Sequence, residues 1–82
     1  MANEFIFKSR TQNQGWGVNY TVTPSEKKGL VVLNQSKRYS NGELVPLRTR
    51  EDITPDHAIV IMSEKGTHYP RGFNEWTLKN IP

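Results

Sequence analysis

The side chains able to do chemistry in this 82-residue chain are mostly cations and aromatic rings. Eleven Lys and Arg residues are joined by eight aromatic rings, two His and no Cys. Cations bind phosphate groups, and exposed aromatic rings stack on nucleobases. Such residues gather on both sides of Asn41-Gly42, so the chemistry that this segment favours is the binding of nucleic acid.

The predicted hairpin around Asn41-Gly42 defines the candidate site. Asn-Gly is typical of a two-residue type I′ turn, because both central residues of that turn need positive φ. With Ser40 facing Glu43, Gln35 faces Arg48. The solvent face then carries Gln35, Lys37, Tyr39, Arg48 and Arg50, and the face expected to pack on the core carries Val32, Val45 and Leu47. The predicted nucleic-acid-binding residues are Tyr39, Lys37, Arg48 and Arg50, with Arg38, Lys8 and Arg10 as supporting cations.

The position of Pro46 agrees with this hairpin. In the predicted register Pro46 lies opposite Lys37 at a non-hydrogen-bonded position, where its missing N–H would point away from the partner strand. No further strand could use that position. The strand over Glu43 to Arg50 is therefore expected at a sheet edge, or with a bulge at Pro46.

Enzyme chemistry finds little support in the residue pattern. Ser63 and His68 are the nearest nucleophile and base, without a recognisable nucleophile turn, and Glu51-Asp52 would point apart on a strand. The six glycines are dispersed among turns, and none forms a phosphate-binding loop. Two histidines with scattered carboxylates are too few for a transition-metal cluster. We predict a non-enzymatic protein with no metal and no cofactor.

The charge distribution favours an anionic partner. Residues 1–50 contain eight cations and three acidic residues, which gives a net charge of +5. Residues 51–82 contain three cations and five acidic residues, which gives a net charge of −2. This separation suggests that a polyanion or an acidic protein meets the first part of the chain. The chain has no Cys and no signal-like N-terminus, and its longest apolar run is Ala58–Met62. We therefore predict a cytoplasmic protein outside the membrane.

A partner protein is the alternative to nucleic acid. The strand over Glu43 to Arg50 has a free edge that could join a partner's sheet, and the loop over 70–73 could present aromatic side chains. The residues predicted for this mode are Glu43, Leu44, Arg71 and Phe73. Such a protein would be a small regulator or inhibitor, and its small core makes a homodimer an expected form.

The elements that position these residues are predicted to be mainly strands of one domain over 1–82. In Trp16–Thr23 apolar and polar residues alternate with the period of two typical of a strand with one buried face. Thr54 and Pro55 predict a short helical turn over 54–57. A small antiparallel sheet or partly open barrel of SH3-like or OB-like type, with five to seven short strands, fits the pattern. The other predicted strands cover 4–11, 30–40, 43–50, 58–62, 67–69 and 73–81, the last with a single helical turn as its alternative.

Overall fold

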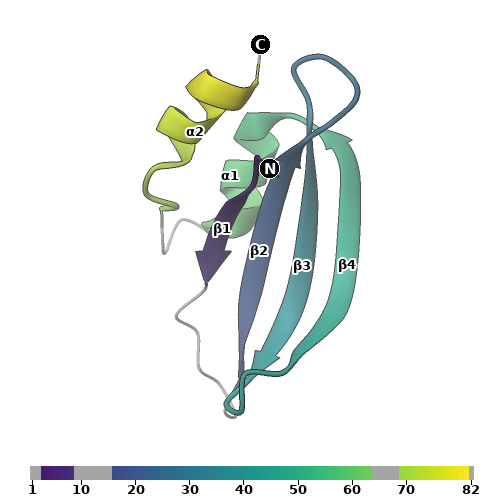
Figure 1. The fold of residues 1–82 in the computed structure, drawn as a ribbon, viewed down its shortest axis with the longest axis vertical. Helices are drawn as coiled ribbons and strands as arrows, with labels where there is room; N and C mark the ends of the chain where they lie inside the picture. The colour runs from purple at the N-terminus through teal and green to yellow at the C-terminus, as the bar shows by residue number, and fades with distance from the viewer. Residues whose placement is uncertain (1–2, 9–15, 64–68, 82) are drawn as a thin grey trace.

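An antiparallel sheet with two short helices on one of its faces makes up the described part of the chain (Figure 1). The computed structural model describes residues 3–8, 16–63 and 69–81. The elements, in chain order, are β1 (Phe5–Lys8), β2 (Trp16–Pro24), β3 (Val31–Tyr39), β4 (Leu44–Ile53), α1 (Pro55–Met62) and α2 (Phe73–Asn80). The prediction of a mainly β protein with an antiparallel sheet is confirmed.

The sheet is open and has four strands across the residues described, fewer than the five to seven predicted. Its strand order is β1-β2-β3-β4, so β1 and β4 are the outer strands. This meander does not support the SH3-like or OB-like barrel that the strand pattern suggested. Two of the predicted strands are helices, and residues 67 and 68 of a third lie outside the described ranges.

Helix α1 begins where the sequence predicts a helical turn and continues through a segment predicted to be a strand. The Thr54 hydroxyl accepts a hydrogen bond from the His57 N–H at 3.1 Å, and Pro55 is the first helical residue. Ala58 and Met62, four residues apart, are both fully buried against the sheet. The β-branched residues over 59–61 each cost less than about 1 kcal/mol in a helix, and this packing outweighs them.

Helix α2 replaces the final strand predicted over 73–81. The rings of Phe73 and Trp76, three residues apart, stack with centroids 5.6 Å apart. Thr77 Oγ1 and Asn80 Nδ2 each donate to the carbonyl four residues earlier, at 2.8 Å. In a strand Leu78 would share the face of Trp76, but in the helix it lies on another side and is 85% exposed.

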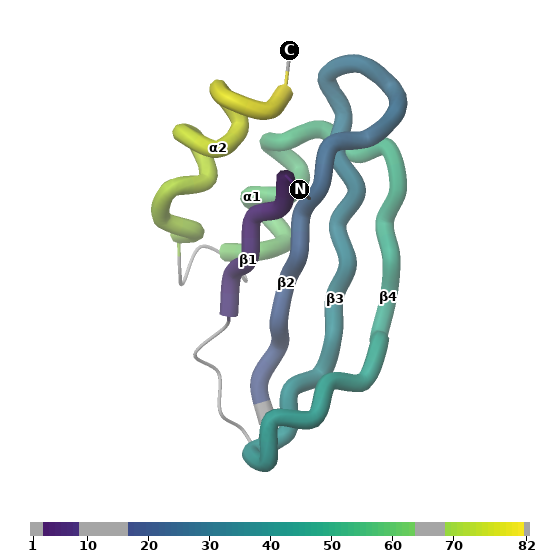
Figure 2. The backbone as a smooth tube through the Cα atoms, viewed as in Figure 1, coloured from purple at the N-terminus to yellow at the C-terminus, as the bar shows by residue number. Residues whose placement is uncertain are grey.

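The core occupies only one end of the sheet. Its sheet residues are Tyr20 and Val22 of β2 and Val31 and Leu33 of β3, with Phe5 and Phe7 of β1 packed against them. The inward Tyr20 and Val22 agree with the alternation predicted for Trp16–Thr23. No core residue comes from 35–39, so β2, β3 and β4 extend beyond the helices toward the 39–43 turn (Figure 2). We call this part, residues 16–19, 35–39 and 44–50, the distal sheet; at its inner boundary Val18 packs against the core and Arg50 pairs with the buried Leu33.

Candidate nucleic-acid interface

The turn at the end of the distal sheet has three residues, Ser40 to Gly42. The Gly42 N–H donates to the Tyr39 carbonyl and the Tyr39 N–H donates to the Glu43 carbonyl, both at 2.9 Å. Gly42 has φ of 91°, and Asn41 does not share this left-handed conformation. The predicted two-residue type I′ turn, with Ser40 facing Glu43, is therefore wrong. The Asn41 carboxamide oxygen accepts from the Glu43 N–H at 2.9 Å, which favours a turn with only one left-handed residue.

A bulge at Leu47 shifts the pairing of β3 with β4 by one residue and restores the predicted register beyond it. Next to the turn, Lys37 pairs with Val45 and Ser36 with Pro46, one residue away from the predicted pairing. Leu47 has no partner, and Gln35 pairs with Arg48 as predicted. Without this bulge Arg48 would pair with Asn34 and lie on the other face of the sheet. The bulge therefore brings the arginines of β4 to the face of β3 that carries Tyr39.

The faces of the sheet are assigned by the buried residues of β3. Val31 and Leu33 are fully buried, and Tyr39 follows them at even spacing on the same face. The prediction that the face with Val32, Val45 and Leu47 packs on the core is wrong. Residues 30–33 are all apolar, so alternation could not show which of their faces the helices cover. The helices pack on the Tyr39 side but end before the distal sheet.

The side chains gathered on the uncovered part of this face form the candidate site. We call it the Tyr39 face; its residues are Gln35, Lys37, Tyr39, Val45, Arg48 and Arg50. The Tyr39 ring is 38% exposed, and Lys37 Nζ lies 5.0 Å from its centroid. Arg50 Nε donates to Gln35 Oε1 at 3.4 Å, and Arg48 is exposed beside Gln35. The structure thus brings together the four residues predicted to contact nucleic acid.

The supporting cations lie elsewhere. Arg38 is on the opposite face, where its guanidinium donates to the Asn19 carboxamide oxygen and, at 3.5 Å, to the Val18 carbonyl. Lys8 pairs with Asn19 across β1 and β2, so Lys8 also belongs to that face. Arg10 lies outside the described residues. The distal sheet therefore carries cations on both faces, with the aromatic and arginine residues on one of them.

Val45 belongs to the Tyr39 face although the sequence pattern placed it toward the core. It pairs with Lys37 and is 37% exposed, which adds apolar surface between the tyrosine and the arginines. The length of the turn is the feature that could have shown the correct face of Val45, because a turn longer by one residue moves Val45 to the other face of the sheet.

The groups of the Tyr39 face are cations, an amide, an aromatic ring and a small apolar patch, which are binding groups. No family model, curated protein or solved structure matches this chain. Within residues 3–8, 16–63 and 69–81, no three His, Asp or Glu side chains are placed to hold a metal ion. Among the described residues, no helix has the length and apolar character needed to cross a membrane. We therefore infer a function from the geometry of the Tyr39 face.

The residues predicted for a partner protein are only partly accessible. Glu43 and Arg71 are exposed, and Leu44 is 50% exposed at the start of β4. Phe73 is fully buried between α2 and β1, with its ring 5.1 Å from that of Phe5 in an edge-to-face contact. Phe73 is therefore a core residue, and the predicted contact of its ring with a partner is wrong.

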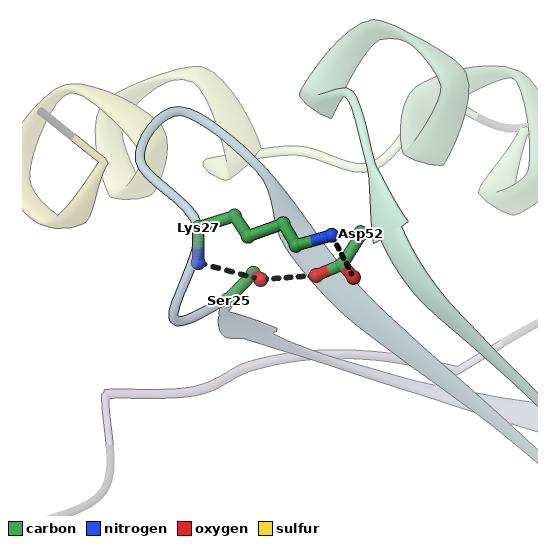
Figure 3. Close-up of polar contacts among 3 residues, drawn as sticks. All are labelled: Ser25, Lys27 and Asp52. Carbon is green, nitrogen blue, oxygen red and sulfur yellow. Dashed lines mark hydrogen bonds and ion pairs between the residues drawn. The ribbon is translucent and has the colours of Figure 1, made fainter.

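A second polar cluster, at the opposite end of the sheet, joins the β2–β3 loop to β4 (Figure 3). The Ser25 hydroxyl donates to the Asp52 carboxylate and accepts from the Lys27 N–H at 3.0 Å. Lys27 Nζ lies 3.5 Å from the same carboxylate. Asp52 has φ of 56° in a bulge of β4, so these contacts hold a conformation that non-glycine residues rarely adopt. The pocket beside the cluster is lined by three acidic residues, Glu26, Glu51 and Asp52, and by one cation, Lys27, and this net negative charge disfavours phosphate binding there.

The Ser25–Asp52 contact makes an acid-dependent contribution to stability. The hydrogen bond from Ser25, and then the charge of Lys27, lower the pKa of Asp52 below its ordinary value of 3.8. The stabilisation is complete above pH 3.8 and is lost as the pH falls through the lower pKa of the folded state. We expect Ser25→Ala to lower the melting temperature near neutral pH, and the difference from the parent chain to shrink below about pH 4.

Thermal melts across this pH range, with Ser40→Ala as the matched substitution in another exposed turn, measure this dependence. A Ser25→Ala difference that stays constant down to about pH 2 would contradict the assignment.

Proposed function

We propose that this chain is a non-enzymatic nucleic-acid-binding module that contacts its ligand through the Tyr39 face. The observation that supports the proposal most directly is that an exposed ring and three cations lie on one face of the sheet, largely beyond the helices. Cations supply the affinity for a phosphate backbone, and the ring supplies a surface for a base. Arg48 and Arg50 come from the edge strand, where a long polymer can reach them from the side.

The distribution of charge along the molecule supports the same interface. In the distal sheet Lys37, Arg48 and Arg50 lie on one face and Arg38 lies on the other, the face to which Lys8 of β1 also belongs. The acidic side chains of the described chain lie elsewhere, apart from Glu43 at the turn: Glu4, Glu26, Glu51, Asp52, Asp56 and Glu75. Lys27, Lys28, Arg71 and Lys79 also lie outside the distal sheet, so acidic residues exceed cations there only slightly, and a polyanion is attracted more strongly to the distal sheet.

The salt dependence of binding tests the proposal. If Lys37, Arg48 and Arg50 each contact a phosphate, the logarithm of the association constant should fall linearly with the logarithm of the salt concentration. The expected slope is about −2 to −3. Fluorescence anisotropy with labelled DNA and RNA oligonucleotides of mixed sequence, in single-stranded and duplex form, measures the slope. If none of these oligonucleotides binds at low salt, or if affinity does not change with salt, nucleic acid is not the ligand of this face.

A partner protein is the second candidate, and the exposed leucines of β4 favour it. Leu44 is 50% exposed and Leu47 is 53% exposed, close to the free edge of the sheet.

This edge is poorly suited to strand addition. The Tyr39–Glu43 hydrogen bond places Pro46 at a position whose N–H would point outward, and the Leu47 bulge interrupts the strand one residue later. A protein partner would thus rely on side-chain contacts, and its affinity would depend weakly on salt.

A further inference from the structure

We propose that the Tyr39 face binds single-stranded nucleic acid in preference to duplex, with a base stacked on Tyr39 and phosphates bound along β4. This inference rests on the proposed function and specifies its ligand. Every base has a flat face that can stack on an aromatic ring, and in a duplex both faces of an internal base are already covered by its neighbours. Lys37 Nζ lies over the Tyr39 ring, 5.0 Å from its centroid, so a stacked base takes the other side of the ring or displaces Lys37, and only an unpaired base is free to do so.

The arrangement of the side chains across the two strands gives the orientation of the ligand. Tyr39 and Lys37 project from β3, and Arg48 and Arg50 project from β4 at the rim of the sheet. Phosphates bound at the rim leave the bases free to turn inward over Val45, Lys37 and Tyr39. The strand therefore lies along β4, with its backbone toward solvent.

The spacing along the sheet shows that the ligand must be extended. Tyr39 lies level with Glu43, whereas Arg48 lies level with Gln35, four residues away along β3. At about 3.3 Å per residue this separation is about 13 Å. The base on Tyr39 and the phosphate on Arg48 then belong to different nucleotides of one strand. A single strand can extend over this distance because its bases are free to unstack.

The elements that commonly read duplex DNA are poorly placed in this molecule. Helices α1 and α2 have eight residues each and pack on the core, and their first turns carry Asp56 and Glu75, which repel phosphate. A two-stranded ribbon can enter the major groove, which is about 12 Å wide. Here the β3–β4 hairpin is flanked by β2 as far as Tyr39, so three strands side by side would have to enter together. These features favour the single strand over the duplex.

Matched oligonucleotides test the preference. The probes are fluorescein-labelled oligothymidylate and oligouridylate of about 12 nucleotides, a length in the range that small β-domains cover, and a DNA duplex of equal length. Anisotropy at one fixed salt concentration gives the affinities of the full chain. We expect at least about tenfold tighter binding of one or both single strands than of the duplex.

Substitution of the tyrosine tests the stacking. We expect Tyr39→Ala to weaken single-strand binding about tenfold and to change duplex binding less than about twofold, since a lost base stack removes about that much affinity. Tyr39→Phe, which keeps the ring, should bind as the parent chain does. Tyr69→Ala, at a tyrosine that is 53% exposed outside this face, is the matched control. Thermal melts of each variant show that it is folded.

The outcomes separate this inference from the proposed function. Equal or tighter binding of the duplex, or Tyr39→Ala with unchanged single-strand affinity, would overturn the single-strand inference while leaving nucleic-acid binding in place. Failure of all three probes to bind would instead count against the proposed function itself. Weaker single-strand binding by Tyr39→Phe would show that the hydroxyl, not the ring, makes the contact, and would overturn the stacking.

Discussion

Replacing Phe73 with alanine is expected to lower the free energy of unfolding by about 3–5 kcal/mol. Phe73 is fully buried, and its ring meets Phe5 of β1 edge-to-face at 5.1 Å and Trp76 at 5.6 Å. Truncation would leave a cavity where α2 packs on the sheet. Small domains have a total stability of about 5–15 kcal/mol, so much of the folded population would be lost.

Leu78→Ala is the control for this experiment, because Leu78 is in the same helix and is 85% exposed. Its effect should stay within about 0.5 kcal/mol. Urea denaturation followed by tryptophan fluorescence compares the two variants with the parent chain. Equal effects of the two substitutions would show that α2 does not pack on the sheet through Phe73.

Removing the two arginines of β4 together is expected to have the largest effect on binding. Each charge-assisted hydrogen bond to a phosphate contributes about 1.5 kcal/mol or more, so Arg48→Ala with Arg50→Ala should weaken nucleic-acid binding about a hundredfold. The slope of log K against log salt should fall in magnitude by about two units. Anisotropy titrations at several salt concentrations measure both quantities.

The matched double variant is Lys28→Ala with Lys79→Ala. It makes the same change in net charge, and both lysines are exposed at the helix-covered end of the molecule. We expect a less than threefold effect from it, because exposed charges farther away than about 10 Å are screened at physiological salt. Similar losses from the two double variants would mean that net charge, and not the Tyr39 face, determines binding.

The candidate site could be predicted because its residues are close together in the sequence. Tyr39, Lys37, Arg48 and Arg50 belong to one hairpin, and they share a face because the predicted and observed registers agree at the Gln35–Arg48 pair. The details of that hairpin could not be predicted in the same way. The side chain of Asn41 and the bulge at Leu47 each shift the pairing by one residue, in opposite senses, so the predicted Gln35–Arg48 pair was correct although the turn was not.

The two helices show the limit of local patterns. The segments over 58–62 and 73–80 are short, and short apolar segments fit a strand or a helix almost equally well. The contacts of Ala58, Met62 and Phe73 with the sheet select the helix, and those contacts join residues far apart in the chain. Residue order could show where α1 begins, through Thr54 and Pro55, but not how far it extends.

Residue order alone was enough to predict a mainly β chain, the alternation of Trp16–Thr23 and a cation-rich hairpin beside a tyrosine. These features depend on neighbouring residues, whose backbone preferences and side-chain alternation act locally. The packing of the helices on the sheet, in contrast, shows which face of β3 is covered, that the helices stop short of Tyr39, and that Arg38 and Lys8 lie on the other face. The physical reason is that burial depends on which elements meet in space, and residues 30–33 are apolar enough for either face to be covered.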